Sequence, residues 1–395
     1  MKNKKIFLLS NKFYFPHFGG VETTVKHHAD FLSKNFRHKI NVLVSNEKFQ
    51  FYTKIFKQNL RLSIVKVEQL GIFFSMPVSI SYPIKFIKFA KTSDVIFLHE
   101  PWPLGTISLF IFNFFFRQKR QKTIIFWHSD TKKLFFIDQI LLYLQKYNIR
   151  KSNFVLVNKE EVLKNSKIKN LKDLKNKVYV LPTPIIFLTK NKNISNEILN
   201  FVTNIKNNNN EIFLFYGRLA KYKGIEIILK SLSLISNKKV VLIFGKGVLE
   251  NAVKEEIQNN NNLFFFNRFI NDKEKIFVLK NSTAFLFPSI SNSETLGLTQ
   301  IEALSQGCPV INTSIKTAVP YVSINNITGK TILPNNHLEL AYAINNFPSI
   351  NGKEWEKLSH NSKERYNKHF SANIFEKKLS YLVKNVIDGK LGNFK

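Results

Sequence analysis

A chain of 395 residues exceeds the length that one hydrophobic core usually supports, so two domains are expected. A hydrophobic content of 44% with 39 Phe excludes a disordered protein, and the single cysteine, Cys308, excludes an internal disulfide and indicates a reducing compartment. The formal net charge of +32 leaves three interpretations open: nucleic-acid binding, attraction to an anionic membrane surface, or the Lys-, Asn-, Ile- and Phe-rich composition of an AT-rich genome.

In the first half of the chain, short apolar runs alternate with helix-length amphipathic segments, which is typical of α/β folds with parallel sheets. The clearest helices are 21–34 and 134–148. The apolar run after residues 1–5 is too short for a signal peptide and is predicted to be the first strand. Strands are predicted at 5–10, 40–45, 62–67, 95–99, 123–127, 154–158 and 178–181.

The second half repeats this alternation after a break. Residues 181–210 are polar and loop-like, as in an interdomain linker. Strands follow at 212–216, 240–244, 263–266, 284–287 and 310–312, and a last helix, 372–387, is surplus to the second sheet. We therefore predict an N-terminal domain over 1–183, a linker region over 184–210, a second domain over 211–370 and a C-terminal helical segment over 371–395.

The first chemical motif, Pro16-His17-Phe18-Gly19-Gly20-Val21-Glu22, lies between the first strand and the first helix. Glycines at such a turn let the backbone approach a ligand closely, and the N-terminus of a helix favours an anion. An ordinary tight turn also explains Gly19 and Gly20, and the spacing is not that of the NAD-binding glycine fingerprint.

The second motif, residues 217–224, follows the first strand of the second domain and holds Arg218 and Lys223 between two glycines. Open α/β sheets bind ligands at this end of their strands. Arg offers a planar fork to phosphate oxygens and Lys a point charge, so both are candidates to hold a diphosphate and stabilise it as a leaving group. The alternative is a chance pair of cations in a very basic chain.

The third motif is the most specific. A polar loop with Glu294 follows the strand 284–287, and a helix beginning near Gly297 carries Glu302 and stops at Gly307. Both carboxylates are then predicted near the carboxyl edge of the second sheet, where they can accept hydrogen bonds from sugar hydroxyls. The alternative is one loop acid and one exposed helical Glu.

A fourth constellation belongs to the N-terminal domain, where His99-Glu100 and His128 with Asp130 follow two apolar strands. Each histidine is therefore expected to face a cleft at the carboxyl edge of the sheet. A hydrogen-bonded structural histidine is the competing interpretation. Nine His with one Cys give no spacing typical of a structural zinc site.

Taken together, these motifs resemble the GT-B glycosyltransferases, specifically the retaining glycosyltransferase family 4, over nearly the whole chain. The most specific match is Glu294 and Glu302 within the family's Glu-x-Phe-Gly, Glu-Ala and Gly-x-Pro-Val signature. The resemblance implies two Rossmann-like domains facing across a cleft, with the acceptor domain first, the donor domain second, a final helix crossing back onto the first domain, and no metal requirement.

The resemblance also implies residue roles. Arg218 and Lys223 would hold the donor diphosphate, Glu302 the ribose and Glu294 the sugar, and the amides around Gly297 and Leu298 would add donor contacts. Gly19-Gly20 would close over the phosphates, and His128 would lie near the transferred sugar. On the acceptor side the candidates are His99, Glu100 and Asp130.

Two departures from the family pattern affect what can be expected. Leu296 replaces the usual Phe, which is a conservative apolar change, and residues 316–320 replace a glycine-rich turn, which weakens any expectation about the donor sugar.

The expected activity is transfer of a hexose from a UDP- or GDP-sugar to a glycan or lipid-linked acceptor in cell-surface polysaccharide or glycolipid synthesis. A nucleotide-sugar epimerase, a sugar phosphorylase and, less readily, a basic nucleic-acid-binding protein remain as alternatives.

The apolar and basic segments of the chain bear on where the protein is located in the cell. The longest apolar stretch, 104–116, is shorter than the ~20 residues that a membrane-spanning helix requires. It is followed by Arg117, Lys119, Arg120 and Lys122, and 80–91 is similarly apolar and basic, so both segments can lie on anionic lipid. A buried helix with basic ends is the alternative. We expect a cytoplasmic protein that associates peripherally with the inner face of the membrane.

Overall fold

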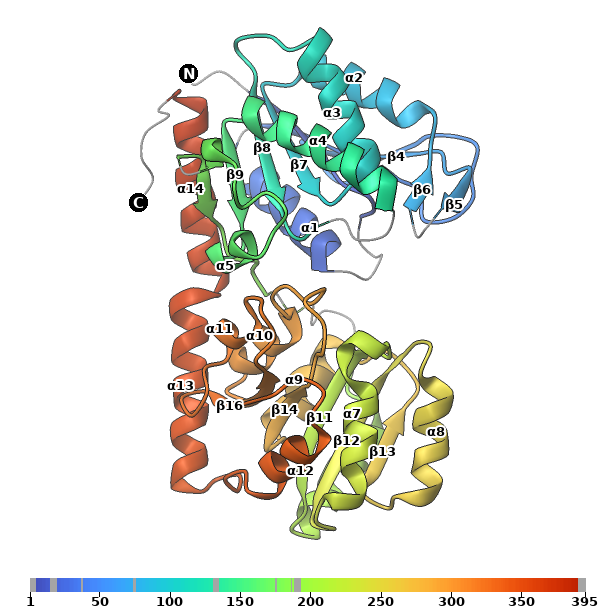
Figure 1. Ribbon diagram of the computed structural model, residues 1–395, viewed down its shortest axis with the longest axis vertical. Helices are drawn as coiled ribbons and strands as arrows, with labels where there is room; N and C mark the ends of the chain where they lie inside the picture. The colour runs from blue at the N-terminus through green and yellow to red at the C-terminus, as the bar shows by residue number, and fades with distance from the viewer. Residues whose placement is uncertain are drawn as a thin grey trace. The chain divides into compact units, whose positions relative to one another are not determined.

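The computed structural model describes residues 5–14, 20–36, 38–73, 76–130, 135–174, 176–185, 187 and 193–389 (Figure 1). Its contacts divide the chain into two compact units. The N-terminal unit comprises Met1–Pro184 together with Phe375–Lys395, and the C-terminal unit comprises Ile185–Ile374. Each unit is built on an open α/β sheet.

The sheet of the N-terminal unit has the strand order β10-β9-β8-β7-β1-β2-β4-β3, and every pairing is parallel except that of β3 with β4. The chain extends the sheet to one side of β1 and then returns to add β7 on the other side. The strands are β1 (Ile6–Ser10), β2 (Lys39–Ser45), β3 (Lys54–Lys57), β4 (Leu62–Val67), β7 (Val95–Glu100), β8 (Lys122–Trp127), β9 (Phe154–Val157) and β10 (Val178–Val180). β5 (Gly71–Phe73) pairs antiparallel with β6 (Met76–Val78) in a separate two-stranded sheet.

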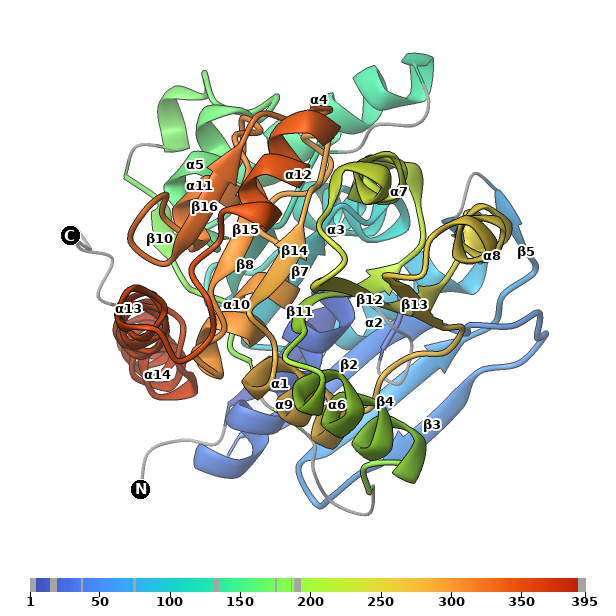
Figure 2. The same ribbon diagram turned by 90° about the horizontal axis from the view of Figure 1, so that it is seen from below.

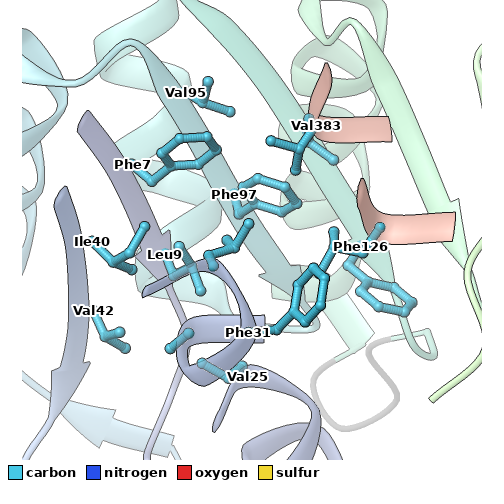
Figure 3. Packing of buried hydrophobic residues seen from close by; sticks show 14 of the residues in the cluster. Phe7, Leu9, Val25, Phe31, Ile40, Val42, Val95, Phe97, Phe126 and Val383 are labelled. Atoms are coloured by element: carbon cyan, nitrogen blue, oxygen red, sulfur yellow. The ribbon is translucent and has the colours of Figure 1, made fainter. Parts of the chain in front are cut away.

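Central strands of this sheet are mainly apolar because both of their faces are covered. β7, for example, is buried along its whole length and begins with four apolar residues. The helices of the N-terminal unit are α1 (Gly20–Asn35), α2 (Ser81–Thr92), α3 (Pro103–Phe115), α4 (Phe135–Lys151), α5 (Glu160–Lys164) and α14 (Ala372–Ile387), with a 3₁₀ turn, η1 (Lys172–Leu174). The apolar side of α14 joins the same core as α1. Figure 3 shows Val383 of α14 close to Phe97 of β7.

The C-terminal unit has an all-parallel sheet with the order β13-β12-β11-β14-β15-β16. Figure 2 shows α7, α8 and α12 on one side of this sheet and α6 and α9 on the other. The strands are β11 (Glu211–Arg218), β12 (Lys239–Lys246), β13 (Leu263–Phe266), β14 (Ala284–Phe287), β15 (Val310–Thr313) and β16 (Gly329–Ile332). The helices are α6 (Asn196–Asn207), α7 (Ile225–Ser231), α8 (Glu250–Asn259), α9 (Asp272–Lys280), α10 (Leu298–Ser305), α11 (Val319–Val322), α12 (His337–Asn345) and α13 (Lys353–His369), with 3₁₀ turns η2 (Lys221–Lys223) and η3 (Leu232–Leu234).

The linker prediction over 184–210 is wrong where α6 forms. Ser195 caps this helix through its side chain, and Ile198, Val202 and Ile205 bury one face of it. The abundance of Asn in the segment hides this spacing in the sequence. Four short strands were also not predicted: β3, β5, β6 and β16.

Candidate functional site

The C-terminal unit has a topological switch point between β11 and β14. From β11 the chain adds β12 and β13 on one side, and it then crosses to add β14, β15 and β16 on the other. Open α/β sheets bind ligands in the crevice outside the carboxyl ends of the two strands at such a point. The end of β11 and the segments that follow β11 and β14 carry all of the C-terminal residues predicted for a donor site.

Arg218 is the last residue of β11 and is exposed beside Lys246, its partner in the β11–β12 register. Within the described part of the chain the Arg218 guanidinium makes no hydrogen bond or ion pair, so it is available to a ligand anion. Gly245 and Gly247 flank Lys246, and neither was predicted to shape the site. A Cβ on Gly245 would lie 2.1 Å from the Gly217 oxygen, so only glycine lets the two strand ends approach this closely.

Gly224 fixes the turn after β11 against the segment after β14. Its φ is +76°, and an added Cβ would lie 1.9 Å from the backbone oxygen of Pro288. The N–H of Ile290 donates to the Tyr222 oxygen at 3.0 Å, so the two segments are hydrogen-bonded as well as packed. This contact sets the distance between Lys223 and Glu294.

Lys223 and Glu294 form an ion pair in which each side chain is only about 15% exposed (15% and 14%). The sequence suggested separate roles for them, one on the diphosphate and one on the sugar. The structure brings them together, so each charge is neutralised by the other until a ligand competes for one of them.

Gly297 begins the turn that starts α10. Its φ is +77°, and a Cβ there would lie 2.4 Å from Phe287 Cζ, so a larger residue is excluded on both counts. Leu298 is the first residue of α10, and the free backbone N–H groups at this end of the helix favour an anion.

Glu302, in the second turn of α10, is held by two partners that sequence analysis did not identify. Tyr216 Oη donates to Glu302 Oε2 at 2.6 Å, and Lys275 Nζ lies 3.2 Å from Glu302 Oε1 and 3.1 Å from an Asp272 oxygen. Burial raises the pKa of Tyr216 and the Glu302 charge raises it further. Burial lowers the pKa of Lys275, but the Glu302 and Asp272 carboxylates outweigh it and raise the pKa overall. Glu302 is therefore an oriented carboxylate with acceptor capacity to spare.

The N-terminal unit has an equivalent switch point between β1 and β7. Gly20 is the exposed first residue of α1, and its oxygen accepts from Thr24 Oγ1 at 2.8 Å. Gly19 lies outside the described residues. The structure thus places one of the two predicted glycines at the start of the helix that follows β1.

The prediction that His99 faces a cleft is wrong, and its neighbour Glu100, a candidate on the acceptor side, is covered as well. Both are buried, with 0% and 1% of their surface exposed. Glu100 accepts from the Trp102 N–H at 2.9 Å and from Thr106 Oγ1 at 2.6 Å, so it stabilises the start of α3. Burial raises its pKa. The two residues are the last of β7. α3 and α4 cover Glu100, whereas His99 lies against His28 of α1.

His128, directly after β8, stays a candidate for a residue near the transferred sugar, and Asp130 stays a candidate on the acceptor side. His128 is 5% exposed, its Nε2 lies 3.0 Å from His99 Nδ1, and burial lowers its pKa to about 3, so the ring is neutral. Asp130 accepts from the Lys167 N–H at 3.0 Å, which ties together the segments after β8 and α5. The described residues contain no group of three or more His, Cys, Asp or Glu placed to hold a metal ion.

Two Rossmann-like domains built on parallel sheets define the GT-B fold of glycosyltransferases. The chain superposes on a glycosyltransferase from Rickettsia africae with a TM-score of 0.73 over 98% of this chain and 100% of that one, at 18% identity. It superposes on HepE from Anabaena in complex with UDP with a TM-score of 0.69, over 96% of this chain and 100% of that one, at 14% identity.

Within this fold, residues 197–365 match the family model described as "Glycosyl transferases group 1". The chain is 24% identical to the O-antigen chain mannosyltransferase C of Escherichia coli over 311 residues. This aligned region covers 78% of this chain and 80% of that protein. The matched segment lies within the C-terminal unit, and it contains Arg218, Lys223, Glu294 and Glu302.

Proposed function

We propose that the protein is a retaining glycosyltransferase. It moves a hexose from a UDP- or GDP-sugar to a glycan or lipid-linked acceptor in the synthesis of a cell-surface polysaccharide or glycolipid. The observation that carries this proposal is the carboxyl edge of β11 and β14. There the Arg218 guanidinium, which has no partner among the described residues, occurs in one unit with the N-terminus of α10 and an oriented carboxylate. The mannosyltransferase activity and the UDP complex of the related proteins support it.

In this proposal the donor binds the C-terminal unit. Arg218 and the N-terminus of α10 hold the diphosphate, and Glu302 accepts from the ribose hydroxyls. The sugar competes for the Lys223–Glu294 pair: Glu294 accepts from a sugar hydroxyl and Lys223 turns to the diphosphate. Two positive side chains then stand where a metal ion would otherwise be required, so we propose metal-independent transfer.

During transfer the bond between C1 of the sugar and the diphosphate oxygen breaks, and the charge that develops is stabilised by Arg218 and Lys223. The acceptor hydroxyl attacks C1 from the face that the diphosphate leaves, and its proton passes to the departing phosphate. The anomeric configuration is thereby retained. We assign His128 a hydrogen bond to the transferred sugar, and we keep Asp130 as a residue near the acceptor.

Calorimetric titration with UDP, GDP, ADP and CMP tests the donor site. It is performed at moderately high salt because a chain of charge +32 binds polyanions without specificity. We expect saturable binding of one nucleotide, lost by at least tenfold in Arg218→Ala and Glu302→Gln. Lys330→Ala on β16 and Glu356→Gln on α13 remove exposed charges elsewhere in the unit and serve as matched controls.

Product analysis then tests the reaction itself. A glycosylated acceptor of retained configuration, formed equally in EDTA, supports the proposal. A changed nucleotide sugar without acceptor identifies an epimerase, and a free sugar phosphate identifies a phosphorylase. Binding of duplex or single-stranded nucleic acid that weakens with salt and is unaffected by Glu302→Gln would instead assign the charge to nucleic acid.

An exposed apolar and basic surface on the N-terminal unit supports peripheral membrane binding. Tyr82 and Phe86 bury one face of α2, whereas Ile84, Lys88 and Lys91 are exposed on the opposite face. The described residues include no helix long and apolar enough to cross a membrane. A stripe that mixes isoleucine with lysine suits the interface of an anionic bilayer.

The stripe of α2 continues into the end of α3. Lys91 Nζ lies 4.1 Å from the centre of the Phe116 ring, and the adjoining Phe114 and Phe115 are 61% and 68% exposed. We propose that this surface binds the inner face of the membrane, where a lipid-linked acceptor is carried. Co-sedimentation with vesicles containing phosphatidylglycerol, compared with pure phosphatidylcholine vesicles, is expected to weaken several-fold in the double variant Phe114→Ser, Phe115→Ser. Absence of binding at low salt would refute the membrane proposal.

A further inference from the structure

Three histidines from α1, β7 and the end of β8 share one buried site in the N-terminal unit, and the proposed function uses only His128. His28 and His99 have ring centres 5.2 Å apart. The rings of His99 and His128 lie 5.3 Å apart and are within 13° of coplanar, with His99 Nδ1 3.0 Å from His128 Nε2. Nearly coplanar rings at this spacing, joined nitrogen to nitrogen, have the geometry of an in-plane N–H···N hydrogen bond.

The surroundings of this hydrogen bond exclude an imidazolium. The Phe126 ring stacks on His128 with centres 4.1 Å apart, and His28 lies between Phe126 and Phe375 of α14. Burial lowers the pKa of all three histidines, and the neighbouring rings lower those of His28 and His99 further. One neutral ring therefore donates to another, and each ring carries a single proton.

The unpaired nitrogens decide which ring is the donor. His99 Nε2 is fully buried and has no hydrogen-bond partner among the described residues. A proton on that atom would leave an orphaned N–H, which is rarer in protein interiors than an orphaned lone pair. The proton of His99 therefore belongs on Nδ1, where it is donated to His128 Nε2. Because that nitrogen accepts, His128 carries its own proton on Nδ1.

The geometry points to His99 as a positioning residue that fixes His128 in its Nδ1-protonated tautomer. This inference rests on the proposed function of His128. His128 Nδ1 makes no hydrogen bond to the described residues and is not among their fully buried unpaired atoms, so it is the nitrogen of the cluster left for a ligand. His128 then acts as a hydrogen-bond donor to a sugar oxygen, and it neither takes up nor releases a proton.

Nitrogen NMR of protein labelled with ¹⁵N-histidine tests the tautomer without any assay of activity. Each tautomer has its own pattern of ring-nitrogen shifts, and His128→Gln identifies the signal of His128. We expect the Nδ1-protonated pattern in the wild type, loss of that preference in His99→Phe, and its recovery in His99→Asn, whose amide places an N–H near the position of Nδ1. An Nε2-protonated His128 in the wild type, or an unchanged pattern in His99→Phe, would overturn the inference.

Measurement of kcat tests whether the positioning of His128 by His99 affects sugar transfer. His99→Phe is expected to lower kcat about three- to tenfold, the range that one neutral hydrogen bond contributes, with little change in KM for the donor, and His99→Asn is expected to restore it. A shifted tautomer with unchanged kcat would refute the positioning role. If the wild type transferred no sugar from any nucleotide, the proposed function would fail, and the NMR result would decide the tautomer independently. Circular dichroism confirms that each variant is folded.

Discussion

Replacing Gly224 with alanine tests the contact that fixes the turn after β11 against the segment after β14. The added Cβ would lie 1.9 Å from the Pro288 oxygen, so the backbone must move by about 1.5 Å to reach an ordinary contact. Overpacking of this kind costs about 1–3 kcal/mol. The φ of +76° adds about 1–2 kcal/mol for a residue with a side chain. The sum of about 2–5 kcal/mol lowers the melting temperature of a unit of this size by about 5–15 °C.

Differential scanning calorimetry measures this loss, and nucleotide titration below the melting temperature measures its effect on the site. Because the displaced segment leads to Glu294, we also expect donor affinity to fall by about tenfold or more. Gly389 has a φ of +70°, but an added Cβ there meets nothing within 4 Å. Gly389→Ala therefore reports the backbone cost alone, about 1–2 kcal/mol. A Gly224→Ala protein that melts within 2 °C of the wild type would show that the two segments do not pack as described.

Three further predictions follow from the ion pairs and the buried histidines. Lys275→Met removes the cation that holds Glu302 and should cost about 1–3 kcal/mol in urea unfolding, whereas Lys280→Met at the exposed end of α9 should cost almost nothing; equal losses would refute the role of Lys275. Glu294→Gln frees Lys223, so the free nucleoside diphosphate should bind about threefold more tightly while the nucleotide sugar binds more weakly; calorimetry that shows both weakened contradicts the competition. Burial holds the pKa of His128 in the folded protein at about 3, below the unfolded value of about 6.5. The unfolded chain therefore binds the proton first, and the free energy of unfolding falls as the pH drops from 6.5 towards 3. His128 alone should account for about 2 kcal/mol of the loss between pH 7.5 and pH 5, and a His128→Gln protein with the same pH dependence would refute this.

The sequence was sufficient to place Arg218, Lys223, Glu294 and Glu302 at one edge of the second sheet. Each follows a predicted strand closely, and parallel strands bring their carboxyl ends to a common edge. The sequence did not predict which side chains contact one another at that edge. The contacts of Glu302 with Tyr216 and of Lys223 with Glu294 join elements 71 or more residues apart in the sequence, and their formation depends on side-chain conformation.

The N-terminal unit shows the limit of the same reasoning. A position at the end of a strand predicts the edge of the sheet that a residue occupies, but it does not predict what covers that edge. Glu100 lies where expected and is nevertheless buried, because its carboxylate binds the first turn of α3 and Gln145 of α4. Likewise, α6 was missed because its Asn-rich composition outweighed the three buried apolar residues at helical spacing.

The place of α14 in the N-terminal core has a consequence for how the protein is made. Phe375, Leu379, Leu382 and Val386 belong to the same buried cluster as the strands and α1 of that unit, yet they are synthesised only after the whole C-terminal unit. The C-terminal unit is continuous in sequence and can close its core as soon as it emerges, whereas the N-terminal unit waits with Phe97 and Phe126 incompletely covered. The part of the chain that is synthesised first is therefore the part that completes its folding last, and a nascent chain ending before residue 372 should depend on chaperones in a way that the full chain does not.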